Sequence, residues 1–101
     1  MVKKESFNLY KSGKRDMELR AVKPQWKNSE VGDVATIQCG RDLLRKKIIR
    51  IYRGTLARIL LEVDYKRIFP KASTVFEAVK ATKELYPTAE EFMAFELEDI
   101  A

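Results

Sequence analysis

The segment of residues 11–20 carries the densest set of groups that can do chemistry. Gly13 permits a tight turn and a close backbone approach to a ligand, and the cations Lys14 and Arg15 follow it. Glu18 and Arg20 are two residues apart in an alternating apolar–polar stretch, so a strand would present both on one face. Such cations can hold phosphate or a base edge by charge-assisted hydrogen bonds. We therefore predict that Lys11, Lys14, Arg15, Glu18 and Arg20 contact nucleic acid.

Glu18 has three interpretations that the sequence leaves open. Its carboxylate can accept a hydrogen bond from the amino group of a base, or it can orient Arg20. It can also form an ion pair whose only role is to stabilise the domain.

Two aromatic residues are candidates for stacking on a base, which is how single-stranded RNA is commonly bound. Trp26 stands in a predicted loop between Lys23 and Lys27, and Tyr52 stands on a predicted strand that also carries Arg50. The alternative for both aromatic side chains is packing within the fold. We add Trp26, Arg50 and Tyr52 to the predicted nucleic-acid-binding residues.

Residue types that are missing exclude several classes of enzyme. The chain has no histidine and one cysteine, so a Ser-His-Asp triad, a Cys-His pair, an imidazole metal site and an internal disulfide cannot form within it. Cys39 is expected to be a small, half-buried apolar residue. We expect no cofactor and no metal.

Charge is distributed unevenly along the 101 residues, whose net charge is +5. Residues 1–53 hold 14 basic and 6 acidic side chains, a net charge of +8, whereas residues 54–101 hold 6 basic and 9 acidic ones, a net charge of −3. Such asymmetry indicates contact with nucleic acid, although long cations can also simply solvate a strand and protect its edge.

The pattern of apolar residues predicts one α+β domain spanning residues 1–101. We expect a short helix over 5–11, strands over 17–22, 34–39, 43–53 and 92–97, and a helix over 55–63. A longer helix begins at Ser73 or Thr74, where Thr74 and Glu77 have capping-box spacing, and ends at Tyr86-Pro87. Its expected apolar face is Val75, Phe76, Val79 and Leu85, and the five phenylalanines are assigned mostly to the core: Phe7, Phe69, Phe76, Phe92 and Phe95.

The ordered motifs resemble those of the ASCH domain family, a branch of the PUA-like fold. Ser12, Gly13, Lys14, Glu18 and Arg20 match the family's Ser-Gly-Lys signature and the following Glu-x-Arg strand, whereas Arg15 and Asp16 depart from it. Further matching stretches follow in order: Val31-Gly32-Asp33, Ile68-Phe69-Pro70, Tyr86-Pro87 and residues 92–97. The resemblance implies a small β-barrel of about five to six strands with two to three flanking helices, and binding of RNA or a nucleotide in a cleft beside the barrel.

Some small members of this family are amidohydrolases that act on acylated cytidine with a lysine, a threonine and a glutamate. Carried over by position, these three residues fall on Arg15, Glu18 and near Lys71, so none is kept. Arginine does not deprotonate to act as a base. A nucleoside hydrolase with rearranged residues and a purely structural or interaction protein remain the alternatives to RNA binding.

The chain also carries signals about where the protein works. No apolar run approaches the roughly 18 residues of a membrane span, and the first residues lack the apolar stretch of a signal peptide. We expect a cytoplasmic protein without membrane contact. Few Asn and Gln residues together with 35% charged residues predict a thermophilic source. The oligomeric state is not readable from the sequence.

Overall fold

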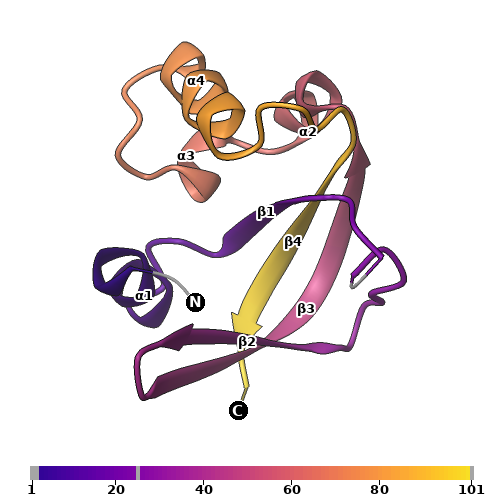
Figure 1. The fold of residues 1–101 in the computed structure, drawn as a ribbon. Coiled ribbons are helices and arrows are strands. Elements are labelled where there is room, and N and C mark those ends of the chain that lie inside the picture. The colour runs from indigo at the N-terminus through magenta and orange to yellow at the C-terminus, as the bar shows by residue number, and fades with distance from the viewer. Residues whose placement is uncertain (1–2, 25, 101) are drawn as a thin grey trace.

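The eight helices and strands alternate irregularly along the chain, which confirms the predicted α+β class (Figure 1). The structure is a computed structural model that describes residues 3–24 and 26–100; residues 1, 2, 25 and 101 of the predicted domain lie outside the described residues. In chain order the elements are α1 (Lys4–Lys11), β1 (Met17–Ala21), β2 (Val34–Cys39), β3 (Asp42–Gly54), α2 (Leu56–Glu62), α3 (Tyr65–Ile68), α4 (Val75–Leu85) and β4 (Phe92–Asp99).

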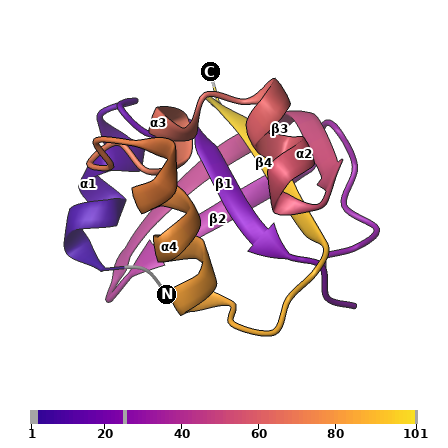
Figure 2. The same ribbon diagram turned by 90° about the horizontal axis from the view of Figure 1, so that it is seen from above.

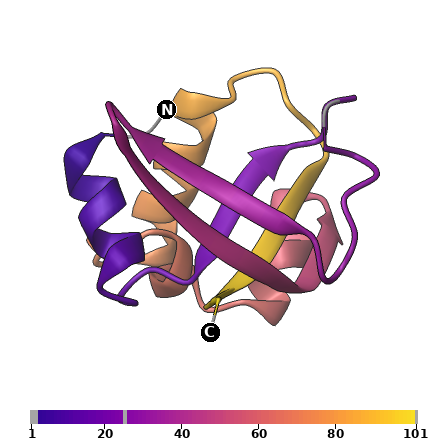
Figure 3. The ribbon, with the colours of Figure 1, turned by 90° about the horizontal axis from the view of Figure 1, so that it is seen from below.

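The strands form one antiparallel sheet in the order β1-β4-β3-β2. Seen from below, the β2–β3 hairpin crosses β1 and β4 at a steep angle, and the sheet curls into half a barrel (Figure 3). The expectation of five to six strands is wrong in number, since the described residues form four. Four helices are present in the residues that the structure describes, because residues 65–68 form a short helix in a stretch that we expected only to end α2.

A two-residue loop connects β2 to β3. Cys39 pairs with Asp42, and Gly40 between them adopts a φ of +59°. Glycine with positive φ at the first loop position is what a tight hairpin turn of the primed type requires. The turn fixes the register that pairs Ile37 with Leu44.

A β-bulge interrupts the long strand β3. Ile48 pairs with Leu97 and Arg50 with Glu96, so Ile49 is an extra residue. Strict alternation would place residues 48, 50 and 52 on one face. The bulge shifts the alternation by one residue, so that Ile51 rather than Arg50 follows Ile48 on that face.

Each face of the sheet carries its own apolar cluster. One face packs against α2 and α3 through buried residues of β1 and β4, among them Met17, Leu19, Phe92 and Ala94. The other is the concave face, whose cluster includes Phe7 and Tyr10 of α1 together with residues of β2, β3 and β4. Viewed from above, α2, α3 and α4 lie over the sheet and α1 lies at its side (Figure 2). β1 forms one of the free edges of the sheet.

The orientation of α4 corrects a prediction. Its buried residues are Ala78 and Thr82, which share a face because they are four positions apart. Phe76 is 81% exposed and Leu85 is 64% exposed, so the expected apolar face points largely to solvent. Phe7, Phe92 and Phe95 are buried as predicted, and Phe69 is half-buried.

The predicted capping box at the start of α4 is present in a slightly altered form. The Thr74 hydroxyl accepts a hydrogen bond from the Glu77 amide at 3.3 Å. The Glu77 carboxylate reaches the amide of Ser73 at 2.8 Å, one residue earlier than the usual partner. The sequence signal therefore located the helix start correctly.

None of the helices in the described part of the chain is both long and apolar enough to cross a bilayer.

Candidate functional site

The turn between α1 and β1 determines where Arg15 lies. Gly13 follows the end of α1 with a φ of +78°, the left-handed conformation that glycine commonly supplies after a helix. The Arg15 amide then donates to the Leu9 carbonyl at 3.0 Å. This reversal brings the Arg15 guanidinium over the ring of Tyr10, 4.7 Å from its centroid.

Arg15 is half-buried, and no described carboxylate pairs with it. Its side-chain hydrogen bond runs from Nε to the carbonyl oxygen of Met17 at 3.4 Å, which is long for such a bond. Four other arginines form ion pairs with carboxylates: Arg20, Arg53, Arg58 and Arg67. A half-buried guanidinium without a carboxylate partner retains its capacity to bind an anion.

Tyr10 forms the floor beneath Arg15 and is 1% exposed. Burial raises the pKa of the Tyr10 phenol above its ordinary value, even though the positive charge of Arg15 acts in the opposite direction. Tyr10 is therefore a neutral aromatic platform throughout the physiological pH range, and it supports Arg15 by a cation–π contact.

Glu18 and Arg20 form an ion pair on the concave face of β1. Oε1 of Glu18 accepts from Nε of Arg20 at 3.0 Å and from its Nη2 at 2.5 Å. Burial lowers the pKa of Arg20, but the charge of Glu18 and its hydrogen bond outweigh burial and raise the pKa overall. The two hydrogen bonds hold the guanidinium against the carboxylate, so Glu18 orients Arg20, which is one of the three interpretations that the sequence left open.

Trp26 packs against this ion pair from the loop after β1. The Arg20 guanidinium lies 5.1 Å from the Trp26 ring centroid, and Lys23 Nζ lies 5.9 Å from it. The indole Nε1 donates to the carbonyl of Ala21 at 2.7 Å. This hydrogen bond fixes Trp26 at the end of β1 and makes it a support for Arg20.

Three cavities meet around these residues. The first, which we call the β1 cleft, has a volume of about 430 Å³ and is lined by Lys3, Ser6, Tyr10, Arg15, Glu18, Leu19, Arg20, Phe69, Leu85 and Tyr86. The second, the barrel cavity, has about 230 Å³ and is lined by Glu18, Arg20 and Trp26 together with residues of β2, β3, β4 and the loop before β2. The Glu18–Arg20 pair is therefore a wall shared by both.

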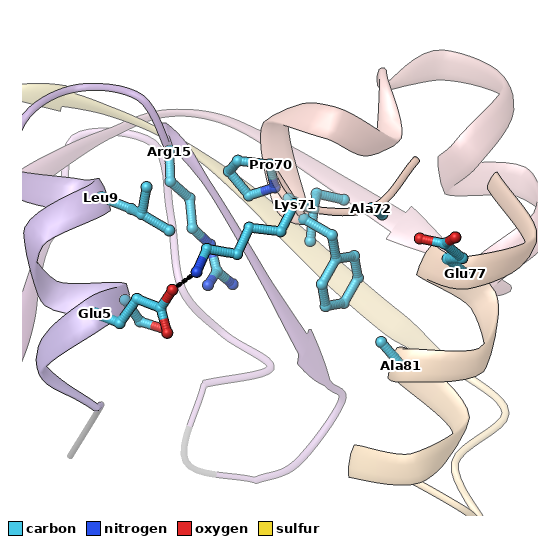
Figure 4. Close-up of a pocket in the computed structure, with 11 residues that line it drawn as sticks. Glu5, Leu9, Arg15, Pro70, Lys71, Ala72, Glu77 and Ala81 are labelled. Atoms are coloured by element: carbon cyan, nitrogen blue, oxygen red, sulfur yellow. Dashed lines mark ion pairs between the residues drawn. The ribbon is translucent and has the colours of Figure 1, made fainter. Parts of the chain in front are cut away.

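The third cavity, which we call the helix cavity, lies between α1 and α4 and has about 320 Å³. It shares Ser6, Arg15 and Phe69 with the β1 cleft. Figure 4 shows Lys71 reaching from the loop before α4 to an ion pair with Glu5 on α1, with Arg15 close to it. The other walls are mainly apolar, so the helix cavity joins an apolar space to the cationic β1 cleft.

Asp16, which departs from the family pattern, has a structural partner. Its carboxylate binds the Arg67 guanidinium of α3 through two hydrogen bonds of 2.9 and 2.8 Å, and Arg67 also pairs with Glu96 of β4 at 3.2 Å. The hydrogen bond to Asp16 raises the pKa of Arg67. Arg67 is thereby committed to joining α3 to the sheet.

The structure brings together only part of the predicted site. Arg15, Glu18 and Arg20 line the β1 cleft, and Trp26 lies behind the Glu18–Arg20 pair. Lys14 is exposed on the turn. Lys11 lines a different depression between α1 and the β2–β3 hairpin.

Arg50 and Tyr52 require a correction, because they lie on the opposite face of the sheet. Tyr52 pairs with Ala94 and packs on the cluster under α2 and α3. Arg50 lies beside it and donates to the Tyr52 hydroxyl at 3.3 Å. The bulge at Ile49 is the physical reason, since it reverses which side chains of β3 face the concave side.

Several residues that line the β1 cleft were not predicted from the sequence: Tyr10, Phe69 and Tyr86. Each comes from a separate element, and only the tertiary fold places them beside β1. The Tyr86-Pro87 helix end was visible as a stop signal, but nothing in it pointed to the cleft.

The described residues contain no group of three or more His, Cys, Asp or Glu side chains arranged to hold a metal ion. The polar and aromatic groups that line the β1 cleft are guanidinium, ammonium, carboxylate, hydroxyl and aromatic groups.

Comparisons with known proteins define the fold. No protein-family model matches the sequence, and no curated protein matches it. A crystal structure of hypothetical protein PH0355 is similar, with a TM-score of 0.83 and 22% sequence identity over 98% of this chain and 94% of that chain. The similarity shows a shared α+β fold with a half-barrel sheet over nearly the whole length of both chains.

Proposed function

We propose that this protein is an RNA-binding module of the ASCH type that holds single-stranded RNA or a nucleotide in the β1 cleft. The observation that carries the proposal is the half-buried Arg15, whose guanidinium has no carboxylate partner among the described residues and lines the cleft beside the Glu18–Arg20 pair. Arg15 supplies charge for a phosphate, and the pair supplies an acceptor and a donor for a base edge.

The size and walls of the cleft suit such a ligand. Its volume of about 430 Å³ is within the roughly 300–1,000 Å³ of small-molecule sites. Tyr86 and Phe69 add aromatic surface to the walls of the cleft, and bases stack on such surfaces. The net charge of +8 on residues 1–53 would favour the approach of a polyanion.

Fluorescence anisotropy with a labelled single-stranded RNA of mixed sequence, about ten nucleotides long, tests the proposal. We expect Arg15→Ala to weaken binding about tenfold and to lower the salt slope by about 0.7, the value for one phosphate contact on a single strand. Arg20→Ala should weaken binding as well, and exposed Lys14→Ala should weaken it less.

Arg50→Ala is the matched control, because it removes the same charge from the opposite face of the sheet. Its affinity should stay within about twofold of the wild type, which is the scale expected from loss of one distant charge. Equal losses for Arg15→Ala and Arg50→Ala would show that binding is diffuse, and the β1 cleft would then not be the site.

The hydrolase alternative has a structural basis that the same protein sample can test. Arg15 and Lys71, two of the positions carried over from the amidohydrolases, line the helix cavity, and Arg15 and Glu18 line the β1 cleft. Incubation with acylated nucleosides followed by chromatography measures turnover directly. We expect none, because the guanidinium of Arg15 does not deprotonate to act as a base and the carboxylate of Glu18 does not replace a hydroxyl nucleophile.

A further inference from the structure

We infer that Glu18 makes the β1 cleft select bases that carry an exocyclic amino group, namely adenine, cytosine and guanine, over uracil. This inference rests on the proposed function, and it adds the class of base that the site accepts. The two carboxylate oxygens of Glu18 carry the inference.

The two oxygens of Glu18 are in different situations. Oε1 accepts both hydrogen bonds from Arg20, whereas no described residue donates to Oε2. The residue is only 8% exposed, but no fully buried side-chain nitrogen or oxygen among the described residues lacks a partner. Oε2 is therefore at a cavity surface, and both the β1 cleft and the barrel cavity are lined by Glu18.

An ionised carboxylate only accepts hydrogen bonds. It therefore requires a donor from the ligand, and an amino group on a base edge is such a donor. Uracil offers only one N–H on that edge, between two carbonyl oxygens that a carboxylate repels. In adenine and cytosine a ring nitrogen that accepts a hydrogen bond lies next to the amino group, and the neighbouring Arg20 can donate to it.

The position of Arg15 makes this contact compatible with phosphate binding. Arg15, Glu18 and Arg20 line one continuous cleft on the same edge of the sheet. A nucleotide whose phosphate lies at Arg15 can present its base to the Glu18–Arg20 pair. Trp26 stabilises Arg20 from the other side of the pair, so the donor and acceptor are held in place before the base arrives.

The test compares labelled ten-nucleotide oligo(A), oligo(C) and oligo(U) in the same anisotropy assay. Oligo(A) and oligo(C) should bind about tenfold more tightly than oligo(U), the order of magnitude of a specific base contact. In Glu18→Gln the difference should fall below about twofold, because the glutamine amide can also donate a hydrogen bond to a uracil carbonyl oxygen.

Glu91→Gln is the matched control for this substitution. Glu91 likewise accepts from Nε and Nη2 of one arginine, Arg53, but it lines none of the three cavities. This variant should keep the full preference for amino bases.

A competition experiment on the wild-type protein covers the case in which Glu18→Gln does not fold. Cytidine 5′-monophosphate should displace labelled oligo(C) at about tenfold lower concentration than its N4,N4-dimethyl derivative, which has no amino hydrogens.

Three outcomes overturn the inference. If the three oligonucleotides bind equally while Arg15→Ala still weakens binding, base selection fails and the proposed function stands. If the preference persists in Glu18→Gln, another group selects the base. If no oligonucleotide binds, the inference and the proposed function fail together.

Discussion

The two faces of the sheet use the same kinds of side chain for different purposes. On the face that carries α2 and α3, Arg67 is occupied by two carboxylates, Asp16 and Glu96. On the concave side, Arg15 lies on an aromatic ring and has no carboxylate partner among the described residues. An arginine that is paired with carboxylates is structural, whereas one without a carboxylate partner is available to a ligand.

A large loss of stability is expected from a substitution on the helix-bearing face. Ile68 of α3 is completely buried, and truncation of such a residue leaves a cavity. Ile68→Ala should lower the free energy of unfolding by about 3 kcal/mol, measured by urea denaturation. RNA affinity should stay within about twofold at temperatures where the variant is folded. A stability loss below about 1 kcal/mol would show that α3 is not anchored as described.

Two substitutions test the distinction between Arg67 and Arg15. Arg67→Ala should reduce stability by about 1 kcal/mol, because it removes a partly exposed two-carboxylate network, and should leave RNA binding unchanged. Arg15→Ala should reduce RNA affinity about tenfold and change the melting temperature by only about 2 °C. Melting curves and anisotropy on both variants give all four values.

The distinction between the two arginines requires that Arg67→Ala lowers stability without changing RNA binding, and that Arg15→Ala lowers RNA binding with little change in stability. If Arg15→Ala destabilises the domain as much as Arg67→Ala does, the cation–π contact with Tyr10 is structural, and the distinction between the two arginines is wrong.

Tyr10 provides a pH test of the concave side. Burial raises the pKa of its phenol in the folded state, so the folded state binds this proton more tightly than the unfolded state does. The stabilising contribution is therefore complete below the unfolded pKa of about 10 and decreases as the pH rises above it. Urea denaturation at pH 8 and pH 10.5 should show a smaller loss in Tyr10→Phe than in the wild type. Equal losses would mean that other groups, such as lysines, determine the alkaline limit.

The smallest expected effect concerns the outer face of α4. Because Phe76 is 81% exposed, Phe76→Ala should change stability by less than about 0.5 kcal/mol. Phe92→Ala, in which the ring is buried under α2, is the control and should cost about 3–5 kcal/mol. A comparable loss of stability in both variants would show that Phe76 packs in the core, as the sequence predicted.

Most elements were predictable because their signals are local. Period-two alternation located β1, turn signals and apolar residues located β2 and β4, and the Thr74–Glu77 spacing located the start of α4. α3 was missed because a four-residue helix is too short for any periodicity. The site was predicted in part: Arg15, Glu18 and Arg20 share the β1 cleft because they follow one turn and one strand.

The sequence by itself determined the class of fold, the uneven charge and the side chains that can bind an anion, since these depend on composition and short-range spacing. Which of those side chains share a site depends on the tertiary structure. An extra residue at Ile49 turned Arg50 and Tyr52 to the opposite face, and Asp16 occupied Arg67 from 51 positions away. Both effects depend on pairing between distant parts of the chain, which no local pattern encodes.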